Sequence, residues 1–163
     1  MLFPLIEVFG QYNDYALGAR VGGGDGYSFE GNLQMPLGHR SNKRLEITGG
    51  MVGGNSWNSV TSYGSNIMFL IVDHLEMGWQ WYYGGGLFVG ASTYYGTDID
   101  EGISRTGDKF LNVGLVPTIG LEKRYKHIPF IFSIDFRPNI PVVNINYANW
   151  GSIGISLRYR LNQ

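Results

Sequence analysis

Residues 130–140 read FIFSIDFRPNI and carry the clearest alternation of apolar and polar side chains in the chain. Large apolar side chains occupy every second position from Phe130 onward, and Ser133, Asp135 and Arg137 stand between them. Side chains on a β-strand point to opposite faces in turn, whereas the apolar face of a helix repeats at intervals of three and four residues. The stretch therefore predicts a strand with one apolar face and one mostly polar face.

The same period of two recurs from residue 15 to the end of the chain, and no segment has a convincing helical period. In residues 66–74 nearly every side chain is apolar, so the facing of that segment cannot be read. Eight alternating strands in succession favour an all-β fold, an eight-stranded antiparallel up-and-down β-barrel. We predict strands at residues 15–21, 27–37, 44–52, 66–74, 79–92, 111–125, 130–141 and 151–161.

The composition narrows the class of protein. Of 163 residues, 25 are Gly and only 15% are charged, against about 25% in an average soluble domain. The longest strongly apolar run, residues 67–72, is far shorter than the roughly 18 residues of a membrane-spanning helix. The chain has no Cys, which excludes a disulfide scaffold and a Cys-ligated metal. Its net charge of −1 gives no indication of a nucleic-acid partner.

The polar faces of the strands decide which side of the barrel is the inside. They carry Gly, Ser, Asn and Thr, with Arg and carboxylates at intervals, and the four Lys lie in or near the connections. Small polar residues suit the narrow lumen of an eight-stranded barrel, and the apolar faces suit lipid. The sequence therefore predicts a transmembrane β-barrel with a small polar lumen. A soluble, lipocalin-like ligand-binding barrel, with the faces reversed, is the alternative.

The connections between strands differ in length in a way that fits a membrane barrel. The longer ones follow odd-numbered strands, as expected if they are extracellular loops and the others are periplasmic turns. With the N-terminus on the periplasmic side, the loops around residues 53–65, 93–110 and 142–150 face outward. These three loops are therefore the candidates for binding an extracellular ligand.

The first residues differ in texture from the rest of the chain. Residues 1–11 (MLFPLIEVFGQ) are mostly apolar and end like a signal-peptidase site, but they have no basic segment before them. We read them either as the remnant of a truncated signal peptide or as an N-terminal arm. Residues 12–163 form the barrel domain.

Five segments carry a family resemblance: residues 15–22 (YALGARVG), 79–86 (WQWYYGGG), 116–125 (VPTIGLEKRY), 133–138 (SIDFRP) and 156–160 (SLRYR). They resemble the eight-stranded outer-membrane β-barrel proteins of the OmpX and OmpA-barrel type that are common in Bacteroidetes. The resemblance implies a monomer in the outer membrane of a Gram-negative bacterium, with outer-membrane lipid and the barrel-assembly machinery as partners and a structural or surface-binding role. Such barrels usually end in an aromatic residue that the assembly machinery reads, whereas this chain ends in LNQ.

Signatures of catalysis or cofactor binding are weak. The string GHRSN contains His39 and Ser41 in the manner of outer-membrane lipid A deacylases, but it falls in a predicted periplasmic turn. A polar turn is favoured over the alternative of a lipid-modifying enzyme. Asp98, Asp100 and Glu101 lack the rest of an EF-hand pattern and form either a solvated acidic loop or a Ca²⁺ site. We expect no enzymatic activity and no cofactor, and we assign no metal ligands.

The polar faces together place ten charged residues in the lumen. A charge buried alone is costly, so these groups should pair across strands, either as a structural plug of salt bridges or along a path for protons or small ions. The same narrow lumen is expected to leave no room for side chains at the glycine runs 22–24 and 84–86. The predicted lumen charges are Arg20, Glu30, Arg44, Glu46, Glu122, Arg124, Asp135, Arg137, Arg158 and Arg160.

Overall fold

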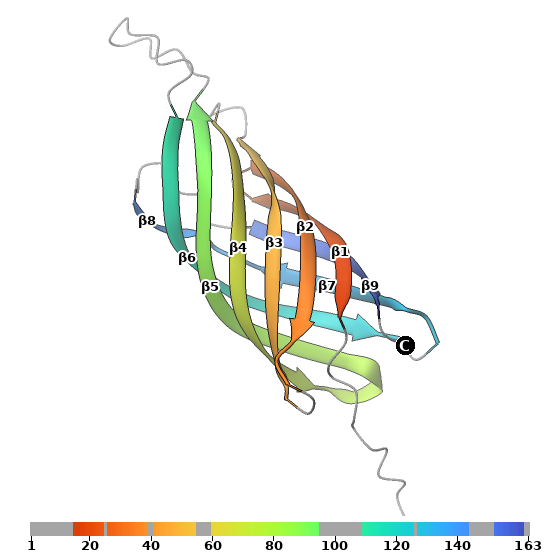
Figure 1. Ribbon diagram of the computed structural model, residues 1–163. Coiled ribbons are helices and arrows are strands. Elements are labelled where there is room, and N and C mark those ends of the chain that lie inside the picture. Colours follow the sequence, from red (N-terminus) through yellow and green to blue (C-terminus); the bar gives the residue numbers. More distant parts are fainter. Residues whose placement is uncertain are drawn as a thin grey trace, which may run out of the picture.

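The structure, a computed structural model, describes residues 15–24, 26–38, 41–54, 60–94, 109–125, 127–143 and 152–161. These residues form antiparallel strands that wrap into an elongated barrel (Figure 1). In the described ranges, no helix is long and apolar enough to cross a membrane. The elements are β1 (Ala16–Gly24), β2 (Gly26–Pro36), β3 (Lys43–Gly54), β4 (Val60–His74), the short 3₁₀ turn η1 (Glu76–Gly78), β5 (Trp79–Tyr94), β6 (Lys109–Arg124), β7 (Phe130–Phe136), β8 (Ile140–Val143) and β9 (Ser152–Arg160).

The barrel closes because its first and last strands pair. β1 and β9 run antiparallel, from Ala16 opposite Arg160 to Gly24 opposite Ser152. β7 and β8 both pair with β6 and occupy successive parts of one position in the wall. The wall therefore has eight strand positions, and the predicted eight-stranded antiparallel barrel is confirmed. Closure also leaves no open sheet edge between the first and last strands.

The predicted strand at residues 130–141 is interrupted at residues 137–139, which separate β7 from β8. Pro138 has no N–H to donate to a neighbouring strand, which explains why the ladder stops here. The Arg137 N–H still donates to the Ser152 carbonyl oxygen (2.9 Å), and this bond holds Arg137 in line with β7. Beyond the break, β8 pairs with β6 through a register shift.

Two predicted boundaries are wrong. β4 begins at Val60 and not near residue 66, because its polar start, including Thr61, still pairs with β3. β1 ends at Gly24 and β2 begins at Gly26, so the first connection is shorter than predicted. The difference has one cause: small and polar residues, including those of the glycine run 22–24, continue the hairpin ladders beyond the apolar part of each strand.

The predicted ligand-binding loops 53–65, 93–110 and 142–150 are partly strand. Their flanks belong to β3 and β4, to β5 and β6, and to β8. Residues 55–59, 95–108 and 144–151 lie outside the described residues, as do residues 1–14. The strand ends next to these segments lie at the end of the barrel opposite Ala16 and Arg160 (Figure 1).

Side chains alternate between the two faces of the wall as the sequence predicts. On β7, Phe132 points outward and is 43% exposed, whereas Ser133 points inward and is 1% exposed. The same alternation answers the open question of β4, where Phe69 is 61% exposed and Leu70 only 1%. The outer surface is thus a continuous apolar belt, and most inward positions are polar or charged.

The two glycine runs have different causes. A Cβ atom on Gly22 would lie 2.5 Å from Ser28 Oγ in the lumen, as expected for a crowded interior. A Cβ atom on Gly84, where φ is 158°, would instead lie 2.0 Å from the carbonyl oxygen of Phe69, in the backbone of β4. The expectation that a filled lumen explains residues 84–86 is therefore wrong for Gly84, which is required by the close approach of a neighbouring strand.

Candidate functional site: the charged lumen

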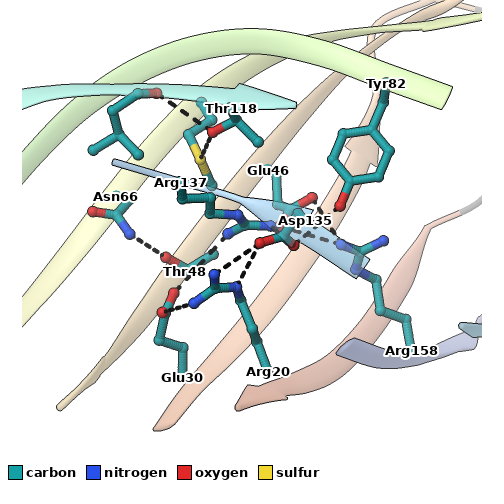
Figure 2. Close-up of polar contacts among 12 residues, drawn as sticks. Arg20, Glu30, Glu46, Thr48, Asn66, Tyr82, Thr118, Asp135, Arg137 and Arg158 are labelled. Carbon is teal, nitrogen blue, oxygen red and sulfur yellow. Dashed lines mark hydrogen bonds and ion pairs between the residues drawn. The ribbon is translucent and has the colours of Figure 1, made fainter. Parts of the chain in front are cut away.

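Nine of the ten predicted lumen charges form one connected set, here called the lumen network. Figure 2 shows the part of it formed by Arg20, Glu30, Glu46, Asp135, Arg137 and Arg158. Arg160 lies at the end of the barrel, opposite Ala16. It donates hydrogen bonds to the carbonyl oxygens of Tyr125 (3.0 Å) and Ile128 (2.8 Å), in the turn between β6 and β7. The lumen network consists of Arg20, Glu30, Arg44, Glu46, Glu122, Arg124, Asp135, Arg137 and Arg158.

One end of the lumen network is built around Arg20 of β1. Its Nη1 lies 2.7 Å from Oε1 of Glu30 on β2, and its Nη2 lies 2.8 Å from Oδ1 of Asp135 on β7. Its Nη1 also donates to Ser28 Oγ (3.3 Å). Since β1 lies between β2 and β9, this single guanidinium links strands from both sides of the closure.

The middle of the network joins opposite walls of the barrel. Arg137 Nη2 donates to Glu46 Oε1 (2.7 Å) and lies 3.1 Å from Asp135 Oδ2. Glu46 Oε2 also lies 3.3 Å from Arg158 Nη2. Asp135 Oδ2 also accepts a hydrogen bond from the Tyr82 hydroxyl (3.1 Å). β3, β5, β7 and β9 are thus held together across the lumen, as Figure 2 shows.

The other end of the network is built around Glu122 of β6. Three guanidinium groups surround this carboxylate: Arg44 at 2.6 Å, Arg124 at 3.0 Å and Arg158 at 3.3 Å. The guanidinium of Arg44 also lies over the ring of Tyr82, 4.3 Å from its centroid. A carboxylate shared by three cations offsets part of their mutual repulsion.

Burial makes the network sensitive to the loss of any one of its members. Arg158, Glu46 and Glu122 are 0% exposed, and Arg20 is 1% exposed. Positive and negative groups alternate along the network, so each guanidinium has a carboxylate within 4.0 Å. In a low-dielectric interior the loss of one partner leaves an uncompensated charge, which costs far more than the pair contributes. The geometry therefore gives the network the means to act as a plug that links the walls.

One part of the lumen is apolar, which the sequence reading missed. Met68, Leu70 and Val72 of β4 pack with Tyr82 and Val116 against this side of the barrel. Residues 66–74 are apolar at almost every position, so the sequence does not show which of their side chains face the lumen. Pairing with β3, whose phase is clear, sets the facing of β4. The lumen is therefore amphipathic, and Tyr82 lies where the apolar cluster meets the charges, under the guanidinium of Arg44 and hydrogen-bonded to Asp135.

Among the described residues, the other motifs singled out in the sequence form no catalytic or metal-binding arrangement. Ser41 accepts a hydrogen bond from the Lys43 N–H (3.1 Å) in the turn between β2 and β3, and His39 lies outside the described residues. The acidic residues Asp98, Asp100 and Glu101 also lie outside them. Over the described part of the chain, no group of three or more His, Cys, Asp or Glu residues is placed to hold a metal ion.

No protein-family model and no curated protein sequence matches this chain. Several solved structures share its fold. The N-terminal β-barrel domain of OprF from Pseudomonas aeruginosa superposes with a TM-score of 0.65 at 12% identity, over 93% of this chain and 98% of the other. Neisserial surface protein A gives a TM-score of 0.59 at 11% identity, over 90% and 94%. Ail, the attachment invasion locus protein of Yersinia pestis, gives 0.50 at 11% identity, over 91% and 97%.

These three neighbours are eight-stranded outer-membrane β-barrels, and this chain shares their fold. The likeness to barrels of the OmpA and OmpX type is thereby confirmed at the level of architecture. At 11–12% identity it carries nothing about activity or source. The relation to Bacteroidetes proteins stays a prediction.

Proposed function

We propose that this chain is a non-catalytic outer-membrane protein that acts as a structural barrel or as a surface-binding one. The observation that carries the proposal is the reversed polarity of the wall. On one strand Ile134 is 45% exposed on the outside, whereas Asp135 next to it is 3% exposed on the inside. The hydrocarbon core of a membrane is the solvent in which an apolar outer belt and a charged interior are both favourable.

The same observation argues against the soluble alternative. A lipocalin-like barrel keeps its apolar side chains inside and its charges in water. Here Leu17, Phe29 and Ile153 are each more than half exposed on the outside. An apolar belt of this extent would drive association in water. The lipid-modifying alternative has its nucleophile candidate, Ser41, engaged in a turn.

The end opposite Ala16 and Arg160 is the proposed outward face. Three connecting segments, residues 55–59, 95–108 and 144–151, join strands at that end. The neighbour Ail is described as an attachment invasion locus protein in complex with the heparin analogue sucrose octasulfate. That description supports surface binding as the second role for a barrel of this architecture. In either role the protein is a monomer, with lipid around its belt and the assembly machinery as its route into the membrane.

The test of the membrane proposal is refolding. We expect the urea-unfolded chain to fold in detergent micelles or liposomes and to migrate differently on SDS gels before and after heating. Brominated lipid should quench the outward-facing Trp81, which is 39% exposed. A monodisperse, folded monomer in buffer without detergent would contradict the proposal.

The orientation can be tested separately, because the chain has no Cys of its own. A single Cys at Asp98 should react with a membrane-impermeant maleimide on intact cells. A single Cys at Met77, which is 87% exposed in η1, should react only after the outer membrane is opened. The reverse pattern would place the termini outside.

A further inference from the structure

The half of the lumen that lies toward the proposed outward face contains a polar cavity, here called the cup. Its volume is about 30 Å³, and it opens toward the end of the barrel where β1 joins β2. Arg20, Glu30 and Arg137 of the lumen network line it. Its other polar lining residues are Ser28, Thr48, Ser62, Asn66, Asn139 and Ser152.

The cup holds buried polar atoms that make no hydrogen bond among the described residues. Glu30 is 8% exposed, and its Oε2 accepts no hydrogen bond. Arg137 is 2% exposed, and its Nε and Nη1 donate none, although Nη1 lies 4.0 Å from Glu30 Oε2. On the wall, the amide nitrogen of Asn66 donates to Thr48 Oγ1 (2.8 Å), whereas its Oδ1 accepts no hydrogen bond. Figure 2 shows Glu30, Thr48 and Asn66 together on one side of the network.

Buried polar groups without partners are costly, so they favour a ligand that supplies both kinds of hydrogen bond. Glu30 Oε2 and Asn66 Oδ1 need donors, whereas Arg137 Nη1 needs an acceptor. An anion in the cup would meet the carboxylate of Glu30, and a cation would meet the guanidinium groups of Arg137 and Arg20. A hydroxyl group donates and accepts at once and carries no charge.

We propose that the cup binds a neutral hydroxylated group, such as the hydroxymethyl or vicinal diol of a sugar. Its hydroxyls donate to Glu30 Oε2 and Asn66 Oδ1 and accept from Arg137. A cavity of about 30 Å³ holds roughly two water molecules, which is the room that one hydroxymethyl group needs. The rest of the sugar extends through the opening past Val52, and Phe88 offers apolar contact level with Asn66.

The proposal goes beyond the membrane role and requires only a folded barrel, so the two can fail separately. The probe is methyl α-D-glucopyranoside, titrated into isotopically labelled protein in micelles of a detergent without a sugar headgroup. The signals followed are the Arg137 Nε–H and the Asn66 side-chain amide. We expect both signals to move and to saturate together. Signals that move linearly, or not at all, would overturn the proposal.

Two variants and one matched control locate the binding. Asn66→Ala should weaken binding about tenfold, the effect of losing one buried hydrogen-bond acceptor. Val52→Phe should fill the opening and abolish binding. It keeps the proposal testable if Asn66→Ala folds poorly. Asn32→Ala is the control, because Asn32 is a lumen asparagine that does not line the cup. Equal affinities in all three variants, or saturation by ammonium or chloride in place of the sugar, would contradict the proposal.

Discussion

The guanidinium of Arg20 lies against the backbone of Gly154, on the neighbouring strand β9. A Cβ atom placed on Gly154 would be 2.3 Å from both Cζ and Nε of Arg20, closer than any relaxed contact. Arg20 reaches Asp135 and Glu30 only because that space is open. The glycine is therefore a steric requirement of the lumen network, although it carries no charge itself.

Gly154→Ala should consequently destabilise the barrel by displacing Arg20. Overpacking of a filled interior costs about 1–3 kcal/mol, and the strained ion pairs add to that loss. The measurement is the free energy of unfolding in urea, in liposomes. Gly31→Ala is the matched control, because a Cβ there meets only the Gly49 carbonyl oxygen at 3.8 Å. Equal effects of the two substitutions would show that Arg20 adapts freely.

Asp135→Ala should be among the most damaging single changes in the lumen. It leaves Arg20 and Arg137 short of a carboxylate in a buried site, a loss of about 3–5 kcal/mol for a dry pair. Adding Arg20→Met should recover part of that loss, because one orphan charge is then removed. The measurement is a double-mutant cycle on the free energy of unfolding.

The control cycle pairs Asp135→Ala with Arg158→Met. Arg158 makes its ion pairs with Glu46 and Glu122, so its coupling to Asp135 should be much smaller. If the Asp135–Arg20 cycle also gives coupling near zero, the lumen is wet and each charge is solvated on its own. A path for protons or small ions would then be the better account of these residues.

Charge on the outer belt should cost more at mid-height than near the end of the barrel. Ile134 faces outward in the middle of the wall, opposite Ile155, and Leu17 faces outward near the end, opposite Tyr159. Ile134→Arg should cost about 2–4 kcal/mol and Leu17→Arg about 0–1 kcal/mol in liposomes. Equal costs, or the reverse order, would show that the belt does not contact the hydrocarbon core.

The protein should not conduct like a general porin. An eight-stranded lumen is filled by its side chains, whereas an aqueous channel needs 16–18 strands. Here Arg44, Arg158 and Tyr82 are each at most 2% exposed within it. Planar bilayers containing the purified protein should show no steady conductance of porin size. Such conductance would contradict the plug.

The inward or outward facing of most side chains in the wall follows from the amino-acid sequence alone. The alternation around Ser133 and Asp135 sets which side chains share a face, because adjacent side chains on a strand must point in opposite directions. That local rule also identified the lumen charges, since a charge on the lipid side would be too costly. The overestimated first loop shows the limit of the rule, because ladder pairing continues through residues that carry no hydrophobic signal.

Which charges pair with one another depends on the folded barrel. Arg137 pairs with Glu46 across 91 positions of sequence, and no local pattern carries that information. The facing of Met68, the break at Pro138 and the need for glycine at Gly154 have the same origin. Each depends on the register of a neighbouring strand or on a side chain that arrives from across the lumen. Strand parity is a property of the single chain, whereas register and cross-lumen distance exist only once the barrel has closed.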